Sequence, residues 1–215
     1  MAVHISDNLS TDASETSTQT LGAIGAKGSG KSYLAGVIVE GLFDAGCPVL
    51  VLDPIGNWGR GLRLDADGKS PGLPIAVIGG EYGDIPLDAT QGAAIGRFVR
   101  QREASVVIDV SELSKKKRKE FVADLCEALF RESRKQQSPF MVVLEEAHLF
   151  APQRLMAGEE RMFGAVADIV RLGRNHGLGS MLVTQRPQSV SKEVLNQVEC
   201  LFVGGMRGPQ ERKAI

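Results

Sequence analysis

The stretch "TLGAIGAKGSGKSYLAGVIV", residues 20–39, breaks an apolar run with three glycines, Gly25, Gly28 and Gly30. Lys31 and Ser32 follow them, and an apolar segment with helical periodicity begins there. Glycine weakens any regular element that contains it, so this many glycines need a reason other than stability. A strand, the loop G-x-x-x-x-G-K-S and then a helix is the pattern of a phosphate-binding loop.

Each part of the pattern has a physical role at a phosphate group. Glycines let the backbone curve closely around the phosphate and aim successive N–H groups at its oxygens. The helix N-terminus adds partial positive charge, the lysine reaches the β- and γ-phosphates, and the serine hydroxyl ligates Mg²⁺. We therefore expect ATP and Mg²⁺ as cofactors, with the nucleotide bound by Gly25, Ala26, Lys27, Gly28, Ser29, Gly30, Lys31, Ser32 and Tyr33.

A second acidic site is expected if the loop hydrolyses the nucleotide that it binds. The segment "FMVVLEEAH", residues 140–148, supplies one, because Glu145 and Glu146 follow an apolar run that reads as a strand. Ligands of open α/β sheets bind at the carboxyl ends of the strands. Glu145 would then hold the magnesium ion, and Glu146 would orient and deprotonate the attacking water. The alternative is a solvated pair of glutamates that begins the next helix.

Apolar runs of strand length alternate along the chain with longer segments of helical period. The strand candidates are residues 20–25, 48–53, 74–79, 105–110, 140–145, 180–185 and 200–205. The helix candidates are residues 31–45, 90–102, 115–137, 159–176 and 191–198. Near-continuous apolar strands that alternate with helices predict an α/β fold with one mostly parallel sheet and helices on both faces.

No linker divides the chain after the first strand, so we expect one domain over residues 20–215. Residues 1–19 are rich in Ser, Thr and Asp and are predicted to form a flexible tail outside the core. The segment 54–74 is dense in Gly, Pro and Asp and is predicted to be a long surface loop. The last residues, "ERKAI", resemble the start of a helix, so we expect the native chain to extend beyond residue 215.

Bulk properties narrow the class of protein. Of the 215 residues, 43% are hydrophobic and 24% are charged, which is an ordinary globular composition. The formal net charge of −1 gives no overall attraction to nucleic acid, so any such contact must come from a local patch or an assembly. Three scattered cysteines without C-x-x-C spacing disfavour a disulfide framework or a zinc site. No apolar run is long enough to span a bilayer, and we expect a cytoplasmic protein without membrane contact.

Two longer segments carry a family resemblance. "VVLEEAHLFAP", residues 142–152, and "RLGRNHGLGSMLVTQRPQSVSKEVLNQ", residues 171–197, resemble the HerA/FtsK superfamily of ring-forming ATPases, and most closely the central domain of HerA helicases. The likeness extends from about residue 20 to the end of the chain. It implies a RecA-like P-loop core that assembles as a homo-hexamer and moves double-stranded DNA through its channel.

The resemblance also implies roles for further residues. Gln185 matches the polar residue that senses the γ-phosphate, and Asp53 matches an acidic residue near the magnesium ion and the water. Asp53 could instead be a turn or cap residue before Pro54. Arg171 and Arg174 match the neighbourhood of the arginine finger that is supplied to an adjacent subunit, and either could instead be an ordinary surface residue.

Some features of the family pattern are missing. Only about twenty polar residues precede the first strand, where HerA proteins carry a β-barrel that guides partners. The C-terminal extension, with an arginine that acts within its own subunit, is absent or cut short, and Arg207 is the residue left to fill that role.

The sequence leaves open what the ATPase acts on, and it offers weaker expectations for a basic run, a histidine and a tryptophan. The same ATPase could drive a protein partner, such as a nuclease, or act as a nucleotide-gated assembly module with little turnover. The basic run "SKKKRKEF", residues 114–121, is either a solvated helix face or a surface that faces DNA. His148 is expected to serve packing or a local hydrogen bond rather than catalysis. Trp58 is expected to anchor its loop against the domain.

Overall fold

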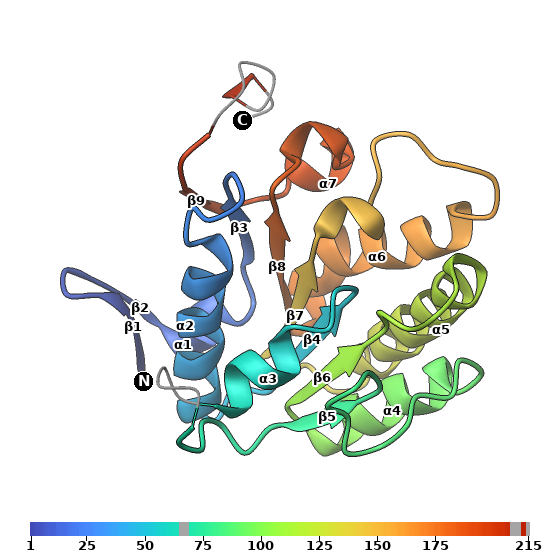
Figure 1. Ribbon diagram of the computed structural model, residues 1–215, viewed down its shortest axis with the longest axis horizontal. Coiled ribbons are helices and arrows are strands. Elements are labelled where there is room, and N and C mark those ends of the chain that lie inside the picture. The colour runs from blue at the N-terminus through green and yellow to red at the C-terminus, as the bar shows by residue number, and fades with distance from the viewer. Residues whose placement is uncertain (65–68, 207–211, 214–215) are drawn as a thin grey trace.

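The computed structural model describes residues 1–64, 69–206 and 212–213. Its central element is a seven-stranded sheet with the order β5-β6-β4-β7-β8-β3-β9, in which every neighbouring pair is parallel (Figure 1). The strands, in chain order, are β3 (Thr20–Ile24), β4 (Val49–Asp53), β5 (Ala76–Ile78), β6 (Val106–Asp109), β7 (Phe140–Glu145), β8 (Leu178–Thr184) and β9 (Cys200–Val203). Each of them lies within or overlaps one of the predicted runs, so the prediction of a mostly parallel sheet is confirmed.

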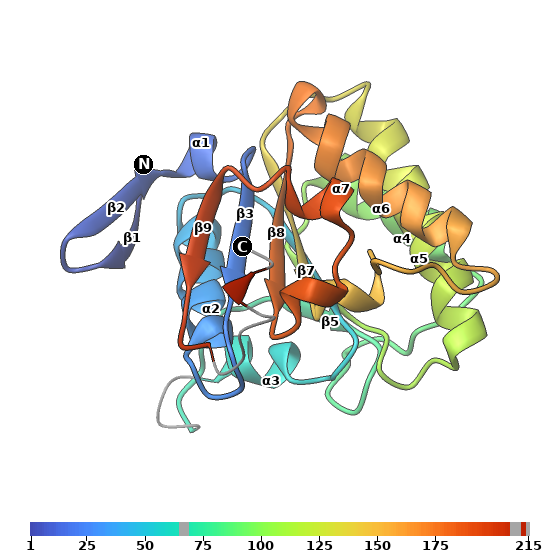
Figure 2. The same ribbon diagram turned by 90° about the horizontal axis from the view of Figure 1, so that it is seen from above.

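Helices cover both faces of this sheet (Figures 1 and 2). One face packs against α2 (Lys31–Asp44) and α3 (Trp58–Arg63), and the other packs against α4 (Gly92–Arg102), α5 (Lys115–Ser133) and α6 (Glu160–Leu172). All residues of β3, β4, β6, β7 and β8 are buried, as expected for parallel strands covered on both sides. Among the described residues, no helix is both long and apolar enough to cross a bilayer.

Short elements lie at the two edges of the sheet, where its strands begin and end. They are η1 (Ala147–Leu149) after β7, η2 (Gly173–His176) before β8, and η3 (Pro187–Ser189) and α7 (Lys192–Leu195) after β8. Because all seven strands are parallel, the loops that follow β3, β4, β6, β7 and β8 meet at one edge of the sheet. This carboxyl edge is where a ligand site is expected in an open α/β sheet.

The prediction that residues 1–19 lie outside the core is wrong. They form the antiparallel hairpin of β1 (Ala2–Ser6) and β2 (Leu9–Asp12), followed by the short helix α1 (Ala13–Thr16). Val3 is fully buried and packs against Gly41 of α2, so the hairpin shares the core of that face. Val3, together with the buried Ala13 and the partly buried Ile5, anchors the segment, which average composition does not reveal.

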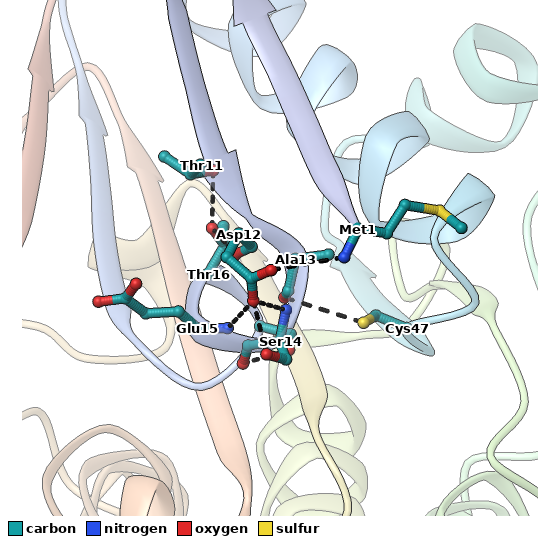
Figure 3. A network of polar contacts seen from close by, with 9 residues as sticks. Met1, Thr11, Asp12, Ala13, Ser14, Glu15, Thr16 and Cys47 are labelled. Carbon is teal, nitrogen blue, oxygen red and sulfur yellow. Dashed lines mark hydrogen bonds and ion pairs between the residues drawn. The ribbon is translucent and has the colours of Figure 1, made fainter.

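A polar network closes the hairpin onto α1 (Figure 3). Asp12 caps the helix: its Oδ1 accepts hydrogen bonds from the Ser14 N–H, at 2.9 Å, and from the Glu15 N–H, at 3.2 Å. The Met1 ammonium lies 3.4 Å from the other carboxylate oxygen. The hydrogen bond from the Ser14 hydroxyl and those from the backbone lower the pKa of Asp12 to about 2, so the cap stays ionised at neutral pH.

The predicted surface loop 54–74 also contains more structure than expected, because α3 lies inside it. Two apolar residues at helical spacing, Trp58 and Leu62, are buried against the sheet and hold this helix in place. Two glycines in six residues weaken the helical signal in the sequence. Most of the predicted C-terminal helix, residues 211–215, lies outside the described residues, as does Arg207.

Candidate functional site

The glycine loop lies between the carboxyl end of β3 and the first turn of α2. Gly28 and Gly30 have φ angles of 81° and 85°, in the left-handed region that residues with a side chain rarely adopt. Gly30 is the N-cap of α2, and no side chain in the described part of the chain caps that helix. Its first N–H groups are therefore left for a ligand, and Lys31 and Ser32 are its first residues.

The loop is braced by the segment after β9, a contact that its sequence does not reveal. The Ala26 N–H donates to the Gly205 carbonyl at 2.8 Å. A side chain at Gly25 would meet the Ser29 hydroxyl and the Gly204 backbone, so only glycine fits there. The Ser29 hydroxyl is buried without a hydrogen-bond partner among the described residues. The end of the sheet's last strand thus supports the outer side of the loop.

Glu145 ends β7, two strands away from the glycine loop, with only 5% of its surface exposed. The Trp58 indole N–H donates to its Oε2 at 2.9 Å. This bond ties α3 to the carboxylate, and it explains why Trp58 is buried. The predicted anchoring role of Trp58 is confirmed, but its anchor is the candidate metal ligand rather than the apolar core alone.

Glu146 follows directly with φ 50°, in the left-handed region. For a residue other than glycine this conformation costs on the order of 1–3 kcal/mol, and such strain concentrates at functional sites. The Gln185 side-chain N–H donates to Glu146 Oε1 at 2.8 Å. Oε2 is buried and has no hydrogen bond from the residues that the structure describes, and His148 Nδ1 lies 3.2 Å from it outside hydrogen-bond geometry. One oxygen of Glu146 is therefore held and the other is left for a ligand.

The pKa values of the two adjacent carboxylates are shifted in opposite directions. Burial raises the pKa of Glu145 to about 7, and the charges of Glu146 and Asp53 add to this effect. Burial also acts on Glu146, but contact with His148 and the charge of Lys31 outweigh it and hold the pKa of Glu146 below its ordinary value. Neighbouring carboxylates with pKa values pushed apart are typical of sites in which the two groups have different tasks.

Asp53 uses its carboxylate to organise the turn that follows β4. Its Oδ1 accepts from the Ile55 and Gly56 N–H groups at 2.8 and 2.9 Å, and its Oδ2 accepts from the Trp58 N–H at 2.8 Å. These contacts are the ones expected if Asp53 is a turn or cap residue. The carboxylate is fully buried, and it lines the same cavity as Glu145.

A cavity of about 600 Å³ opens between α2 and α3. Its lining includes Ser32, Asp53 and Glu145, which come from the carboxyl edge of the sheet. The exposed Tyr33 also forms part of its wall. Hydroxyl and carboxylate oxygens are the ligands that Mg²⁺ prefers, and this ion is bound by one or two carboxylates together with substrate phosphates. Among the described residues no three His, Cys, Asp or Glu side chains cluster as an all-protein metal cage. The residues present therefore fit a magnesium ion that arrives with a nucleotide.

The two candidate finger arginines lie away from this site. Arg171, at the end of α6, is paired with Glu193, and Arg174 in η2 is paired with Glu199. Glu199 also accepts from the N–H of Thr20, the first residue of β3, which places Arg174 at the amino edge of the sheet. The glycine loop is at the opposite edge. Arg171 is near the end of the helix that leads into β8, so both arginines lie toward the amino edge, away from the nucleotide site of their own chain.

Sequence reasoning missed the contacts of two residues. Trp58 approaches Glu145 from a helix that was predicted to be loop, and no spacing rule connects positions 87 residues apart. His148 was expected to serve packing or a local hydrogen bond, but its Nδ1 lies 3.3 Å from the hydroxyl of Thr184, which is 36 residues away on β8. Its proximity to Glu146 could have been suspected from the spacing E-x-H across a tight turn.

Replacement of Glu145 by Gln should stabilise the metal-free protein in a pH-dependent way. The ordinary pKa of 4.5 rises to about 7 in the folded state, so folding binds a proton between these values. The associated stability is present below about pH 4.5 and is lost as pH rises through about 7, a change of about 3 kcal/mol. We expect Glu145→Gln to raise the unfolding free energy by about that amount near pH 8 and by little near pH 5, as measured by urea denaturation with chelator. An equal effect at both pH values would contradict the assignment.

Two solved structures have the same arrangement of helices and strands. The genome packaging NTPase B204 from Sulfolobus turreted icosahedral virus 2, in complex with AMP, superposes with a TM-score of 0.61 at 18% identity, over 92% of this chain and 80% of that one. The pCW3 conjugation coupling protein TcpA, as a monomer with ATPγS, gives a TM-score of 0.56 at 14% identity, over 100% of this chain and 56% of that one. At these identities the likeness shows the fold alone, which is the α/β fold of P-loop NTPases.

The sequence comparisons define the family. Residues 6–137 match the family described as Helicase HerA, central domain. The DNA double-strand break repair helicase HerA of Pyrococcus furiosus is 34% identical over 137 residues, 59% of this chain and 24% of that protein. Because the family match spans more than half of the chain, the protein belongs to the HerA central-domain family, and the resemblance noted from its sequence is confirmed. The chain spans about a quarter of the length of this relative.

Proposed function

We propose that this chain hydrolyses ATP with Mg²⁺. The observation that carries the proposal is Glu146, a strained and buried carboxylate directly after β7, with one oxygen held by Gln185 and the other without a hydrogen bond among the described residues and 3.2 Å from His148 Nδ1. A module that only binds nucleotide has no need for a carboxylate fixed in this way. Family membership and the glycine loop support the same conclusion.

Each site residue then has a separate task. Gly25–Ser32 cradle the phosphates, and Lys31 neutralises charge on the β- and γ-phosphates. Ser32 and Glu145 are the residues that would hold Mg²⁺, which would supply positive charge to stabilise the negative charge that develops on the phosphate. Glu146 orients the water and accepts its proton as the oxygen attacks the γ-phosphorus. The bond from that phosphorus to the bridging oxygen breaks, which leaves ADP and inorganic phosphate.

We further propose that the chain works as a homo-hexameric ring that moves double-stranded DNA in the cytoplasm. The relative from Pyrococcus furiosus is named as a DNA double-strand break repair helicase, which supports DNA as the partner. Arg171 and Arg174 support an assembly, because each lies at the edge opposite the nucleotide site and could serve only a neighbouring subunit. Their exposed ion pairs with Glu193 and Glu199 contribute about 1 kcal/mol or less, so a docking subunit could replace them.

Steady-state ATP hydrolysis with and without linear duplex DNA tests this function, with Glu146→Gln as the inactive control. We expect wild type to turn over ATP faster with DNA and the variant to bind nucleotide without turnover. Turnover that is indifferent to DNA would instead favour a motor that acts on a protein partner, such as a nuclease. Nucleotide binding with no turnover in assembled rings, confirmed by native mass measurement, would favour a nucleotide-gated assembly module.

A further inference from the structure

Four consecutive cations, Lys115–Arg118, occupy the first turn of α5. The three lysines are exposed, and Arg118 is half-buried. Within the described parts of the chain, none of the four makes an ion pair or a side-chain hydrogen bond. Lys117 lies within electrostatic range of Asp88, and Lys115 lies within range of Glu159, but neither carboxylate is close enough to form an ion pair with them.

This placement is unfavourable for the helix itself. The N-terminus of a helix carries partial positive charge, so cations in the first turn are repelled by it. Like charges three and four residues apart, such as Lys115 with Arg118 and Lys119, repel one another further. Ser114 caps the helix only weakly, since its hydroxyl accepts from the Lys117 N–H at 3.4 Å. The basic run therefore contributes nothing evident to folding, which points to a role toward a ligand.

The run borders the loop that follows the carboxylate strand. Lys119 Nζ donates to the Ala157 carbonyl at 3.4 Å and pairs with Glu159 at 3.1 Å, which holds residues 151–159 against the start of α5 (Figures 1 and 2). That loop displays Arg154, which is exposed, and Met156, 68% of whose surface is exposed. Cations thus come from two segments that meet at one place.

A third segment joins them from the strand next to the glycine loop. The Gln153 N–H donates to the Ser189 carbonyl at 2.8 Å, and the Lys192 N–H donates to Gln153 Oε1 at 2.8 Å. Lys192 is exposed. The three segments begin after β6, β7 and β8, at the carboxyl edge that also holds the nucleotide site, and the third runs from there toward Arg171, which pairs with Glu193. The third begins just after Gln185, which is bonded to Glu146.

We infer that these three segments form a surface that binds the phosphate backbone of duplex DNA through Lys115, Lys116, Lys117, Arg118, Arg154 and Lys192. The inference rests on the DNA part of the proposed function and assigns the contact surface. Ammonium and guanidinium groups spread over neighbouring segments match a backbone with one charge per about 1.7 Å of duplex. A chain with net charge −1 must use such a local patch to attract DNA.

Duplex is favoured over single-stranded DNA by the lack of stacking groups. Proteins that bind single strands combine cations with exposed aromatic side chains on which bases stack. Among the described residues, the large exposed aromatic side chains are Tyr33, Tyr82 and Phe98, and none lies on the three segments. The surface therefore offers phosphate contacts without base contacts, which is binding by charge rather than by sequence.

The test is duplex binding by the variant Lys115→Gln/Lys116→Gln/Lys117→Gln, measured by fluorescence anisotropy over a salt series in the presence of a non-hydrolysable ATP analogue. The matched control is Arg102→Gln/Arg131→Gln/Arg134→Gln, which removes three exposed cations at the opposite edge of the sheet. We expect the triple lysine variant to bind duplex about tenfold or more weakly near 0.1 M salt. The slope of log K against log salt should fall by about 0.9 for each phosphate that is no longer neutralised, while the control is unchanged. Arg154→Gln alone should reduce the slope by about 0.9.

Measurements of the unfolding temperature and of the DNA-free ATPase rate distinguish a loss of DNA binding from a loss of folding or catalysis. Because the substitutions relieve repulsion at the helix start, the lysine variant should unfold at the same or a slightly higher temperature than wild type, and its DNA-free ATPase rate should be unchanged. Duplex binding and salt slope equal to wild type would overturn the surface while leaving the DNA function intact. Failure of the wild-type protein itself to bind duplex would overturn both. An equal weakening in the control variant would mean that only net charge matters, and it would also overturn the surface.

Discussion

Glu146→Gln should lower kcat for ATP hydrolysis by about 10²–10⁴-fold while leaving ATP binding nearly intact. Glutamine has the same shape, and it can keep its contact with Gln185 through the amide oxygen, but it cannot accept a proton from water. The loss should appear in kcat rather than in KM, because the group acts on the attacking water and not on the bound phosphates. Steady-state hydrolysis together with equilibrium binding of a fluorescent ATP analogue measures both quantities.

The matched control is Glu160→Gln, which removes an exposed carboxylate of the same size from the start of α6. It should leave kcat within about twofold of wild type, because this group is remote from the bonds that change. If Glu146→Gln kept more than about a tenth of wild-type turnover, the water-activating role would be refuted. The neighbouring Glu145, or a group from another subunit, would then be the base to test.

The main chain geometry of the site was predictable because it depends on short-range patterns. The glycine loop needs only its own glycines and the strand and helix beside it, and the Glu145–Glu146 pair needs only to end a buried strand. In a parallel sheet both features must then fall on the same edge. The structure brings Ser32 and Glu145 to one cavity as this topology requires, and it places Gln185 next to Glu146.

Contacts between distant segments were not predictable, because they depend on how the layers pack. Trp58 reaches Glu145 from a glycine-rich segment whose helical signal is weak. Val3 joins the core from a polar segment whose average composition indicates a tail. The resemblance identified Arg171 and Arg174 as candidate fingers, but only the fold shows that they lie at the far edge. In each case the decisive fact is a single side chain and its three-dimensional neighbour rather than a pattern along the chain.

Arg100 is the clearest example of such a long-range contact. Its guanidinium is fully buried at the end of α4 and lies 5.3 Å from the ring centroid of Phe140, the first residue of β7. Its Nε donates to the Ser133 hydroxyl at 2.7 Å, and its Nη atoms donate to the Ser138 hydroxyl and carbonyl at 3.0 and 2.8 Å and to the Gln136 carbonyl. Burial lowers the pKa of Arg100, against the charge of Glu103. The guanidinium thus organises the whole turn that leads into the carboxylate strand.

Arg100→Met should therefore lower the free energy of unfolding by about 2–4 kcal/mol. Methionine fills much of the volume, but it removes all the hydrogen bonds that the guanidinium donates to this turn, and a hydrogen bond to a charged group contributes about 1.5–3 kcal/mol. The gain from no longer burying a charge offsets part of this loss. Urea denaturation at equal m-value measures the change, with the exposed Arg102→Met on the same helix as the control that should shift stability by less than about 0.5 kcal/mol. A change of that small size for Arg100→Met would mean that the turn before β7 folds without the guanidinium, and the orientation of Glu145 and Glu146 would then have to come from Trp58 and Gln185 alone.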